Sequence, residues 1–303
     1  MHYGFLRSHA PGWVVAVMLL VLALAFPLQG IGARQAGGAT AGPSPAASPE
    51  ADSGPRFVIR PKDGADGDYF TVEAEPGTTT ELTVVLGNAD DEPLTLRTYA
   101  NDAVPMTNGG FSIAEESVEP TGTARWIAYP AESYAFGPGE GVERTFTVTV
   151  PEDAAPGQYI AGLALQTAEP LEVEGTSLFN QIIRKTIAVF IIVPGPEEPA
   201  FTLGEPEVQA DAGVPRIVIP VHNTGNVLVR PEGTLTLTDD EGQQVMSAPI
   251  AMGSVYAGTT APLSVALAPD VPEGEYEMTV ELTDEASGLT ASIEGRRVAI
   301  TGT

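Results

Sequence analysis

The sequence predicts an all-β protein, with two tandem immunoglobulin-like antiparallel β-sandwiches after an N-terminal hydrophobic segment. Apolar and polar residues alternate in many short runs, such as residues 142–150, and this is the pattern of a half-buried strand. The chain has 33 glycines and 27 prolines, which favours many turns over long helices. A strand, turn, strand unit at residues 136–166 recurs at residues 257–282, which indicates two copies of one kind of domain.

Length, charge and the absence of cysteine limit the possible functions. A chain of 303 residues is long enough for two domains with separate cores. Its 14 basic residues against 40 acidic ones give a net charge of −26, which would repel the phosphates of nucleic acid, so no nucleic-acid partner is expected. Without cysteine, the chain has no disulfide, no thiolate metal site and no cysteine nucleophile.

Residues 1–33 have the character of a signal peptide or signal anchor. Arg7 precedes a wholly apolar run at residues 13–26, and the small residues up to Ala33 suit a cut that would leave Arg34 as the mature N-terminus. Without that cut, residues 12–31 could span a bilayer core, which takes about 20 residues. The sequence therefore predicts an exported protein, either released from this segment or anchored by it.

A disordered linker is expected at residues 34–56, which are mostly Ala, Gly, Ser and Pro. The first sandwich should follow over residues 57–195. Its predicted strands are 57–60, 69–73, 81–86, 94–100, a short segment at Trp126, 142–150, 159–166 and 182–193. Residues 185–193 are apolar on both faces, so this strand should lie centrally in a sheet.

The Pro- and Gly-rich stretch at residues 194–199 predicts a domain boundary, and the second sandwich should occupy residues 196–303. Its predicted strands are 201–203, 217–222, 233–238, 244–248, 263–267, 275–282 and 291–300. We expect no C-terminal membrane anchor, because no long apolar run follows them.

The residues for common catalytic chemistry are missing, so we predict no enzyme and no catalytic residues. After removal of the signal, His222 is the only histidine, and the sequence contains no nucleophile-elbow, zinc-protease or phosphate-loop motif. The 40 acidic residues offer too many pairs for their spacing to identify glycosidase carboxylates. The alternative is an exported carbohydrate-active enzyme or its accessory β-sandwich module.

Two groups of residues are candidate sites. Asp63, Asp66 and Asp68 lie in an oxygen-rich loop that could hold a structural calcium ion, or could be a solvated turn; no other cofactor is expected. The second group is aromatic and comprises Trp126, Tyr129 and Tyr134. Exposed rings can bind sugars or anchor a protein partner, whereas a sandwich ring can also be part of the core.

Several motifs resemble the WxL-interacting proteins of bacterial cell surfaces, which carry a peptidoglycan-binding-type domain followed by a host-binding-type domain. In the first half the resemblance runs through Tyr69-Phe70, Pro76-Gly77, Asn88, Trp126, Pro138-Gly139, Val150-Pro151, residues 156–159 and residues 182–195. In the second half it rests on residues 222–226 and 231–233. Members of this family usually end in a transmembrane helix and a basic tail, which are expected to be lacking here.

The resemblance implies a non-enzymatic protein of the cell surface that engages cell-wall polysaccharide or other surface proteins. The expected location is extracellular or at the cell surface, with membrane contact only through the N-terminal segment. Without residues 1–33 the charge is 13 minus 40, or −27, which repels anionic wall polymers. We therefore expect adhesion to come from exposed rings and from the open edges of sheets.

Overall fold

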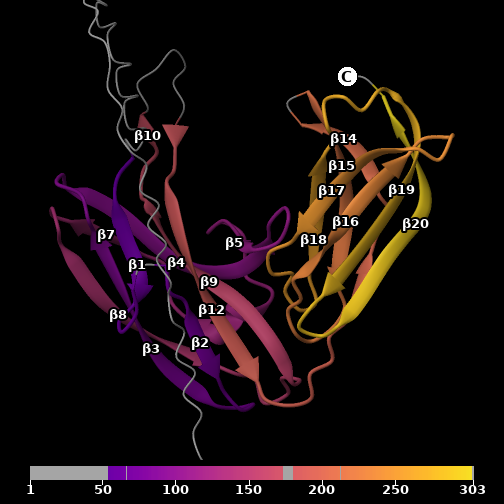
Figure 1. Cartoon of the computed structure of the whole chain (residues 1–303). Helices are drawn as coiled ribbons and strands as arrows, with labels where there is room; N and C mark the ends of the chain where they lie inside the picture. Colours follow the sequence, from indigo (N-terminus) through magenta and orange to yellow (C-terminus); the bar gives the residue numbers. More distant parts are fainter. Residues whose placement is uncertain (1–53, 66, 173–179, 212, 302–303) are drawn as a thin grey trace, which may run out of the picture. The chain divides into compact units, whose positions relative to one another are not determined.

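The chain folds into short strands that form facing sheets in two successive stretches (Figure 1). This computed structural model describes residues 54–65, 67–172, 180–211 and 213–301. Among them, every element is a strand except one short 3₁₀ turn, so the all-β prediction is confirmed. Each stretch has its own hydrophobic cluster, and we call residues 54–193 the first half and residues 201–301 the second half.

The first half contains two facing sheets. One has the strand order β1-β3-β8-β6, and the other has the order β2-β12-β9-β4-β5 with β7 paired to β4, while β10 and β11 form a separate pair. The bounds are β1 Phe57–Pro61, β2 Phe70–Glu73, β3 Thr79–Asn88, β4 Leu94–Pro105, β5 Phe111–Ile113, η1 Thr123–Trp126, β6 Ile127–Ala128, β7 Glu132–Phe136, β8 Gly141–Thr149, β9 Gly157–Thr167, β10 Leu171–Glu172, β11 Asn180–Gln181 and β12 Arg184–Val193.

The core of the first half lies between its two sheets, where alternate residues of each strand meet. On β8, Phe146 and Val148 are buried and the residues between and beside them are more exposed. Phe70 of the opposite sheet meets Phe146 in a T-shaped contact, with 5.2 Å between ring centroids. β9 is buried on its outer face as well, because Ile113 of β5 packs over Gly162 and leaves no room for a Cβ atom there.

One edge of the first half is divided between β1 and β2. β1 pairs antiparallel with β3, whereas β2 pairs parallel with β12, so the chain changes sheets between Pro61 and Phe70. β2 is four residues long and pairs with residues 189–192 of β12. Within the described chain, residues 184–188 of β12 pair only with β9, and their other side is an open strand edge.

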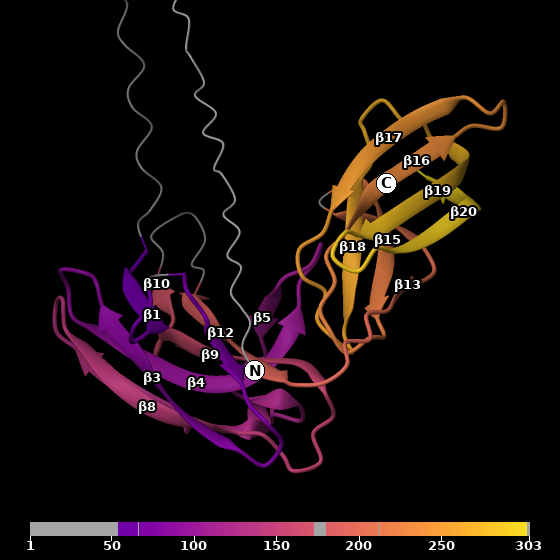
Figure 2. The same cartoon turned by 60° about the horizontal axis from the view of Figure 1, so that its bottom comes forward.

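The second half also contains two sheets. Their orders are β13-β15-β14, with β18 paired to β15, and β17-β16-β19-β20; the latter four strands lie side by side in Figure 2. The bounds are β13 Phe201–Leu203, β14 Glu207–Asp211, β15 Val214–Asn223, β16 Pro231–Thr238, β17 Gln244–Ala251, β18 Thr260–Ala266, β19 Gly274–Asp284 and β20 Leu289–Ile300. Alternation is strict on β19, where Tyr276, Met278, Val280 and Leu282 are buried.

A buried asparagine ends the second strand of each half's first sheet with the same set of hydrogen bonds. Asn88 closes β3 and Asn223 closes β15, and both are almost fully buried. Each side-chain amide donates to the carbonyl four residues later and to a distant carbonyl, of Gly137 and of Val255 respectively. Each side-chain oxygen accepts the N–H two residues later. The two halves therefore share this detail of structure at corresponding strands.

The turn between β4 and β5 contacts the second half. The N–H of Asn108 donates to the carbonyl of Pro262 at 2.8 Å, and its side chain exchanges two hydrogen bonds with the main chain of Ser264. Gly109 has φ +89°, and a Cβ there would lie 2.5 Å from the backbone of Gly253. Glycine is thus required at this position both by the positive φ and by the close approach of the two backbone segments.

Most predicted strands are present, with somewhat different ends, but β5, β7, β10, β11 and β14 are not predicted from the sequence. The expected short strand at Trp126 is displaced by one residue, since η1 ends at Trp126 and the two-residue strand β6 begins at Ile127. The 3₁₀ turn η1 is stabilised by Asp102. The carboxylate of Asp102 accepts the N–H groups of Thr121, Gly122 and Ala124, and these bonds turn the chain. The central position predicted for residues 185–193 holds only where β2 covers β12.

The expected boundary at residues 194–199 falls between the end of β12 and the start of β13. All described residues belong to one compact unit, and the separate folding of residues 57–195 and 196–303 stays a prediction. The predicted signal or anchor helix and nearly all of the linker at residues 34–56 lie outside the described residues. Within the described part of the chain, no helix has the length and apolar character needed to cross a membrane.

Candidate functional site

The open edge of β12 borders a cavity of about 490 Å³, which we call the edge cavity. Four consecutive residues of β12, residues 185–188, line it. Neighbouring residues of a strand point to opposite faces of the sheet, so a cavity that touches four in succession must follow the strand edge. The remaining lining comes from residues on both sides of that edge: Val58, Ile59, Gly67, Asp68, Tyr69, Phe111, Ile160, Phe190, Leu228, Arg230, Ser254 and Tyr256.

Main-chain hydrogen-bonding groups of β12 face this cavity. The carbonyl of Ile192 accepts from Ala74 beyond β2, and the carbonyl of Ile183 accepts from Thr167 next to β9. Because alternate residues of a strand direct their N–H and C=O groups to the same side, the even-numbered residues face away from β9. Thr186 therefore directs its N–H and C=O toward the open edge, where an added strand could form hydrogen bonds with them.

Aromatic and apolar side chains form much of the cavity wall. Tyr69 is 61% exposed, which is high for an aromatic residue. Phe111 and Tyr256 make a T-shaped pair with 6.2 Å between centroids, and burial raises the pKa of the Tyr256 phenol. Ile160 and Phe190 add apolar surface from the outer face of the sheet.

Two cations and one carboxylate line the edge cavity of this acidic protein. The Nζ atom of Lys185 lies 5.6 Å from the ring centroid of Phe57, and Arg230 donates from Nε to the hydroxyl of Ser254 at 3.1 Å. Neither side chain forms an ion pair with a carboxylate of the described residues. Asp68 is engaged locally, since its Oδ2 accepts the N–H of Ala65 at 2.6 Å. The lining thus carries a local excess of positive charge.

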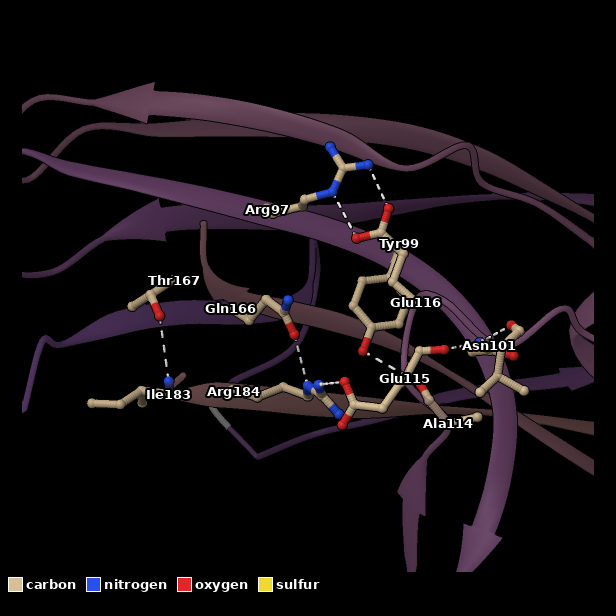
Figure 3. A network of polar contacts seen from close by, with 11 residues as sticks. Arg97, Tyr99, Asn101, Ala114, Glu115, Glu116, Gln166, Thr167, Ile183 and Arg184 are labelled. Atoms are coloured by element: carbon tan, nitrogen blue, oxygen red, sulfur yellow. Dashed lines mark hydrogen bonds and ion pairs between the residues drawn. The ribbon is translucent and has the colours of Figure 1, made fainter. Parts of the chain in front are cut away.

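A second cluster of charges, on the outer face of the same sheet, has a structural role (Figure 3). Arg97 makes a paired contact with Glu116, which holds the pKa of that carboxyl below its usual range. Arg184 donates to Glu115 at 2.6 Å and to the side chain of Gln166 at 2.8 Å. These pairs neutralise one another and attach the segment after β5 to the sheet, so the cluster offers no free charge to a ligand.

The predicted aromatic residues do not form one exposed surface. Tyr129 is 5% exposed, its hydroxyl bonds to that of Thr98 at 2.7 Å, and Arg144 stacks on its ring. Trp126 is half-buried against the core and contacts Tyr159, with 4.5 Å between centroids. Tyr134 stacks on Phe136 and donates from its hydroxyl to Glu132. Tyr129 is therefore a core ring, and ligand binding by Trp126 and Tyr134 stays a prediction.

The predicted calcium loop is described only in part. Asp63 is exposed, Asp68 accepts the N–H of Ala65, and Asp66 lies outside the described residues. Among the residues that the structure describes, no group of three or more His, Asp or Glu side chains is arranged to hold a metal ion. His222 is half-buried and its Nδ1 lies 2.8 Å from the hydroxyl of Thr260 on the adjacent strand.

Of the residues predicted as sites from the sequence, Asp68 lines the edge cavity, although the sequence predicts it as a calcium ligand; the other lining residues are not predicted as site residues. Arg184 and Lys185 are two successive cations at the start of a strand whose residues 187–193 are all apolar, in a chain of net charge −26. Tyr69, Phe111, Arg230 and Tyr256 come from four separate segments, and only the folded chain brings them together.

The fold and the cavity define a β-sandwich protein with a ligand-sized site beside a strand edge. Residues 59–167 match the family model described as WxL Interacting Protein, peptidoglycan binding domain. For this stretch, the match confirms the resemblance to the WxL-interacting protein family that the sequence predicts. It covers most of the first half and none of the second.

Several solved structures resemble this chain distantly. The Pseudomonas aeruginosa CupB2 chaperone is 11% identical, with 78% of this chain and 98% of that chain covered and a TM-score of 0.34. The class 5 fimbriae chaperone CfaA is 11% identical (82% and 100% covered, TM-score 0.31), and the E. coli chaperone DraB is 12% identical (78% and 98% covered, TM-score 0.31). At these scores the likeness carries no conclusion about this chain. No curated protein matches the sequence.

Proposed function

We propose that this chain is an exported, non-enzymatic binding protein of the cell surface that engages cell-wall polymer through tandem immunoglobulin-like sandwiches. The observation that carries this proposal is the family match at residues 59–167, because the matched family is described as a peptidoglycan binding domain. Export is supported by the apolar run at residues 13–26, and location at the surface by the matched family.

The edge cavity is the binding site in this proposal. Its size falls within the range of ligand pockets, about 300–1,000 Å³. Exposed aromatic rings such as Tyr69 offer flat faces that suit sugars, while main-chain groups and cations suit the amides and carboxylates of peptide cross-links. Peptidoglycan contains all of these chemical groups. Such a site binds without turnover, and it requires no acid or base from the protein.

Cosedimentation with purified peptidoglycan sacculi tests the proposal. The protein would comprise residues 34–303, which keep the whole compact unit, and bound protein would be measured against sacculus concentration. We expect saturable binding, and Tyr69→Ala should weaken it about 5- to 30-fold if the ring is an anchor. Because Tyr69 is 61% exposed, this change should leave the fold intact.

The matched control is Val214→Ala, at another exposed apolar side chain, 43% exposed, which does not line the cavity. It should bind like the unchanged protein. Absence of saturable binding by the unchanged protein would contradict the function. Binding that is unaffected by Tyr69→Ala would instead place the polymer away from the edge cavity.

A further inference from the structure

We infer that the edge cavity recognises the peptide stems of the wall polymer, with the stem extended along β12 and its carboxylate held by Lys185 and Arg230. This inference rests on the proposed function and assigns the part of the polymer that enters the site. The alternative within the same polymer is its glycan chain.

The open edge of β12 supplies the first argument. Among the described residues, no second strand pairs with residues 184–188, and Thr186 directs its N–H and C=O into the cavity. These groups pair best with another main chain, because an extended peptide carries donors and acceptors at matching intervals. The four lining residues 185–188 span about 13 Å at 3.3 Å per residue, which is enough for a peptide of about four residues. A glycan has no amide repeat at this spacing.

Charge supplies the second argument. The protein carries a net charge of −26, so an anionic ligand approaches an unfavourable overall field. Lys185 and Arg230 place two positive charges at the cavity against the one carboxylate of Asp68, and neither cation forms an ion pair with a described carboxylate. Cations placed in this way favour a carboxylate ligand, which the stem supplies and a neutral sugar does not.

The short length of the open edge favours a stem over a protein partner. A protein segment that adds to a sheet gains affinity from a long ladder of main-chain bonds, but here β2 occupies the edge from residue 189 onward. Peptidoglycan stems are short and contain D-residues, so a stem pairs with only the few main-chain groups that this edge offers. A site with about five open residues and a cationic lining therefore suits a short peptide with a free carboxylate.

The decisive experiment compares intact sacculi with sacculi from which an amidase has removed the stems, leaving the glycan with a free carboxylate at each cleaved amide. We expect saturable binding to intact sacculi. After stem removal, binding should be weaker by a factor of about 10 or more. Retained binding after stem removal would overturn this inference while the proposed function stands. Absence of binding to intact sacculi would overturn both.

Charge variants test the residues. The double variant Lys185→Gln, Arg230→Gln should bind intact sacculi more weakly by a factor of about 10 or more. The conservative variant Lys185→Arg keeps the positive charge, so it should retain most of the contribution of Lys185 to binding. Both positions are exposed, so folding should be unaffected, and circular dichroism would verify this. Lys62→Gln is the control, because it removes a surface cation that pairs with Glu143 away from the cavity. Equal loss with Lys62→Gln would show a nonspecific charge effect and overturn the assignment.

A soluble peptide test separates the stem from a protein partner. A synthetic stem tetrapeptide with a free carboxylate should compete with sacculi, and the same peptide with an amidated C-terminus should compete less well. If an all-L peptide of the same composition competes better than the stem, the site belongs to a protein segment and the inference is overturned.

Discussion

At the scale of single residues, Asn88 and Asn223 show how a polar side chain can organise a strand end. Each is buried, and each satisfies two main-chain carbonyls and one N–H. The sequence places Asn88 beside a turn, and the local bonds follow from that position. Its bond to Gly137 could not be predicted, because it depends on a partner 49 residues away.

Removing either amide should destabilise the protein. Asn88→Ala and Asn223→Ala each leave two carbonyls without their donor, and a buried group left unpaired costs about 1–3 kcal/mol. Urea unfolding would measure the loss. Thr71→Ala, at an exposed position of β2, should change the free energy of unfolding by less than about 0.5 kcal/mol. Equal effects at all three positions would contradict a special role for the asparagines.

Tyr129 and Tyr134 differ in burial although they are close in sequence. Tyr129→Phe removes a hydroxyl that bonds to the buried Thr98, which itself donates to Ala164, so we expect a loss of about 1 kcal/mol in unfolding free energy. Tyr134→Phe removes only an exposed bond to Glu132 and should be nearly neutral at pH 7. Thermal or urea unfolding of the two variants would reveal the difference, and the reverse order would contradict the assigned burial.

Alkaline pH should destabilise the fold through Tyr134. Partial burial, together with its bond to the Glu132 carboxylate, raises the pKa of Tyr134 to about 12, from a usual value of about 10. The unfolded chain then loses this proton at lower pH than the folded chain, so the stabilisation is complete below about pH 10 and is lost as pH rises toward 12. Unfolding followed across that range should show a shallower decline for Tyr134→Phe. An unchanged decline would assign the effect to other tyrosines.

At the scale of elements, regular strands are predictable and short irregular ones are not. The alternation in β8 and β19 marks both strands and the faces they bury. β5 has three residues and β7 carries few apolar ones, so neither shows a periodic pattern long enough to detect. The edge cavity is missed for a related reason: it exists because β2 stops short of residues 184–188, and strand pairing is not visible in the sequence.

The hairpin tip between β4 and β5 offers a test of backbone constraint. Gly109→Ala introduces a Cβ 2.5 Å from Gly253 at φ +89°, whereas Gly110→Ala has the same φ with open space around it. Left-handed backbone alone costs alanine about 1–2 kcal/mol, so Gly110→Ala should lose roughly that amount and Gly109→Ala clearly more. The difference between the unfolding free energies of these two variants would measure the contribution of the contact with Gly253. Equal losses would show that the backbone at Gly253 moves to accommodate the Cβ atom.

At the scale of the whole molecule, the two halves have separate hydrophobic clusters but share hydrogen bonds at Asn108 and Gln158. We predict that residues 200–303 fold alone, with a cooperative urea transition that Asn223→Ala shifts to lower denaturant. In the complete chain, Asn88→Ala should shift only the transition of the first half. A fragment without cooperative unfolding would show that the second half depends on the first.

The position of Asn108 also has a consequence for solubility. β18 is an outer strand, and its free side is occupied by the side chain and N–H of Asn108 and is further blunted by Pro262, which has no N–H to offer. A bare outer strand is a template on which other copies of a chain can stack. When residues 200–303 are separated from the β4–β5 turn, Ser264 loses both of its bonds to Asn108. The isolated second half should then form concentration-dependent aggregates that the complete chain avoids, and light scattering during storage would detect them.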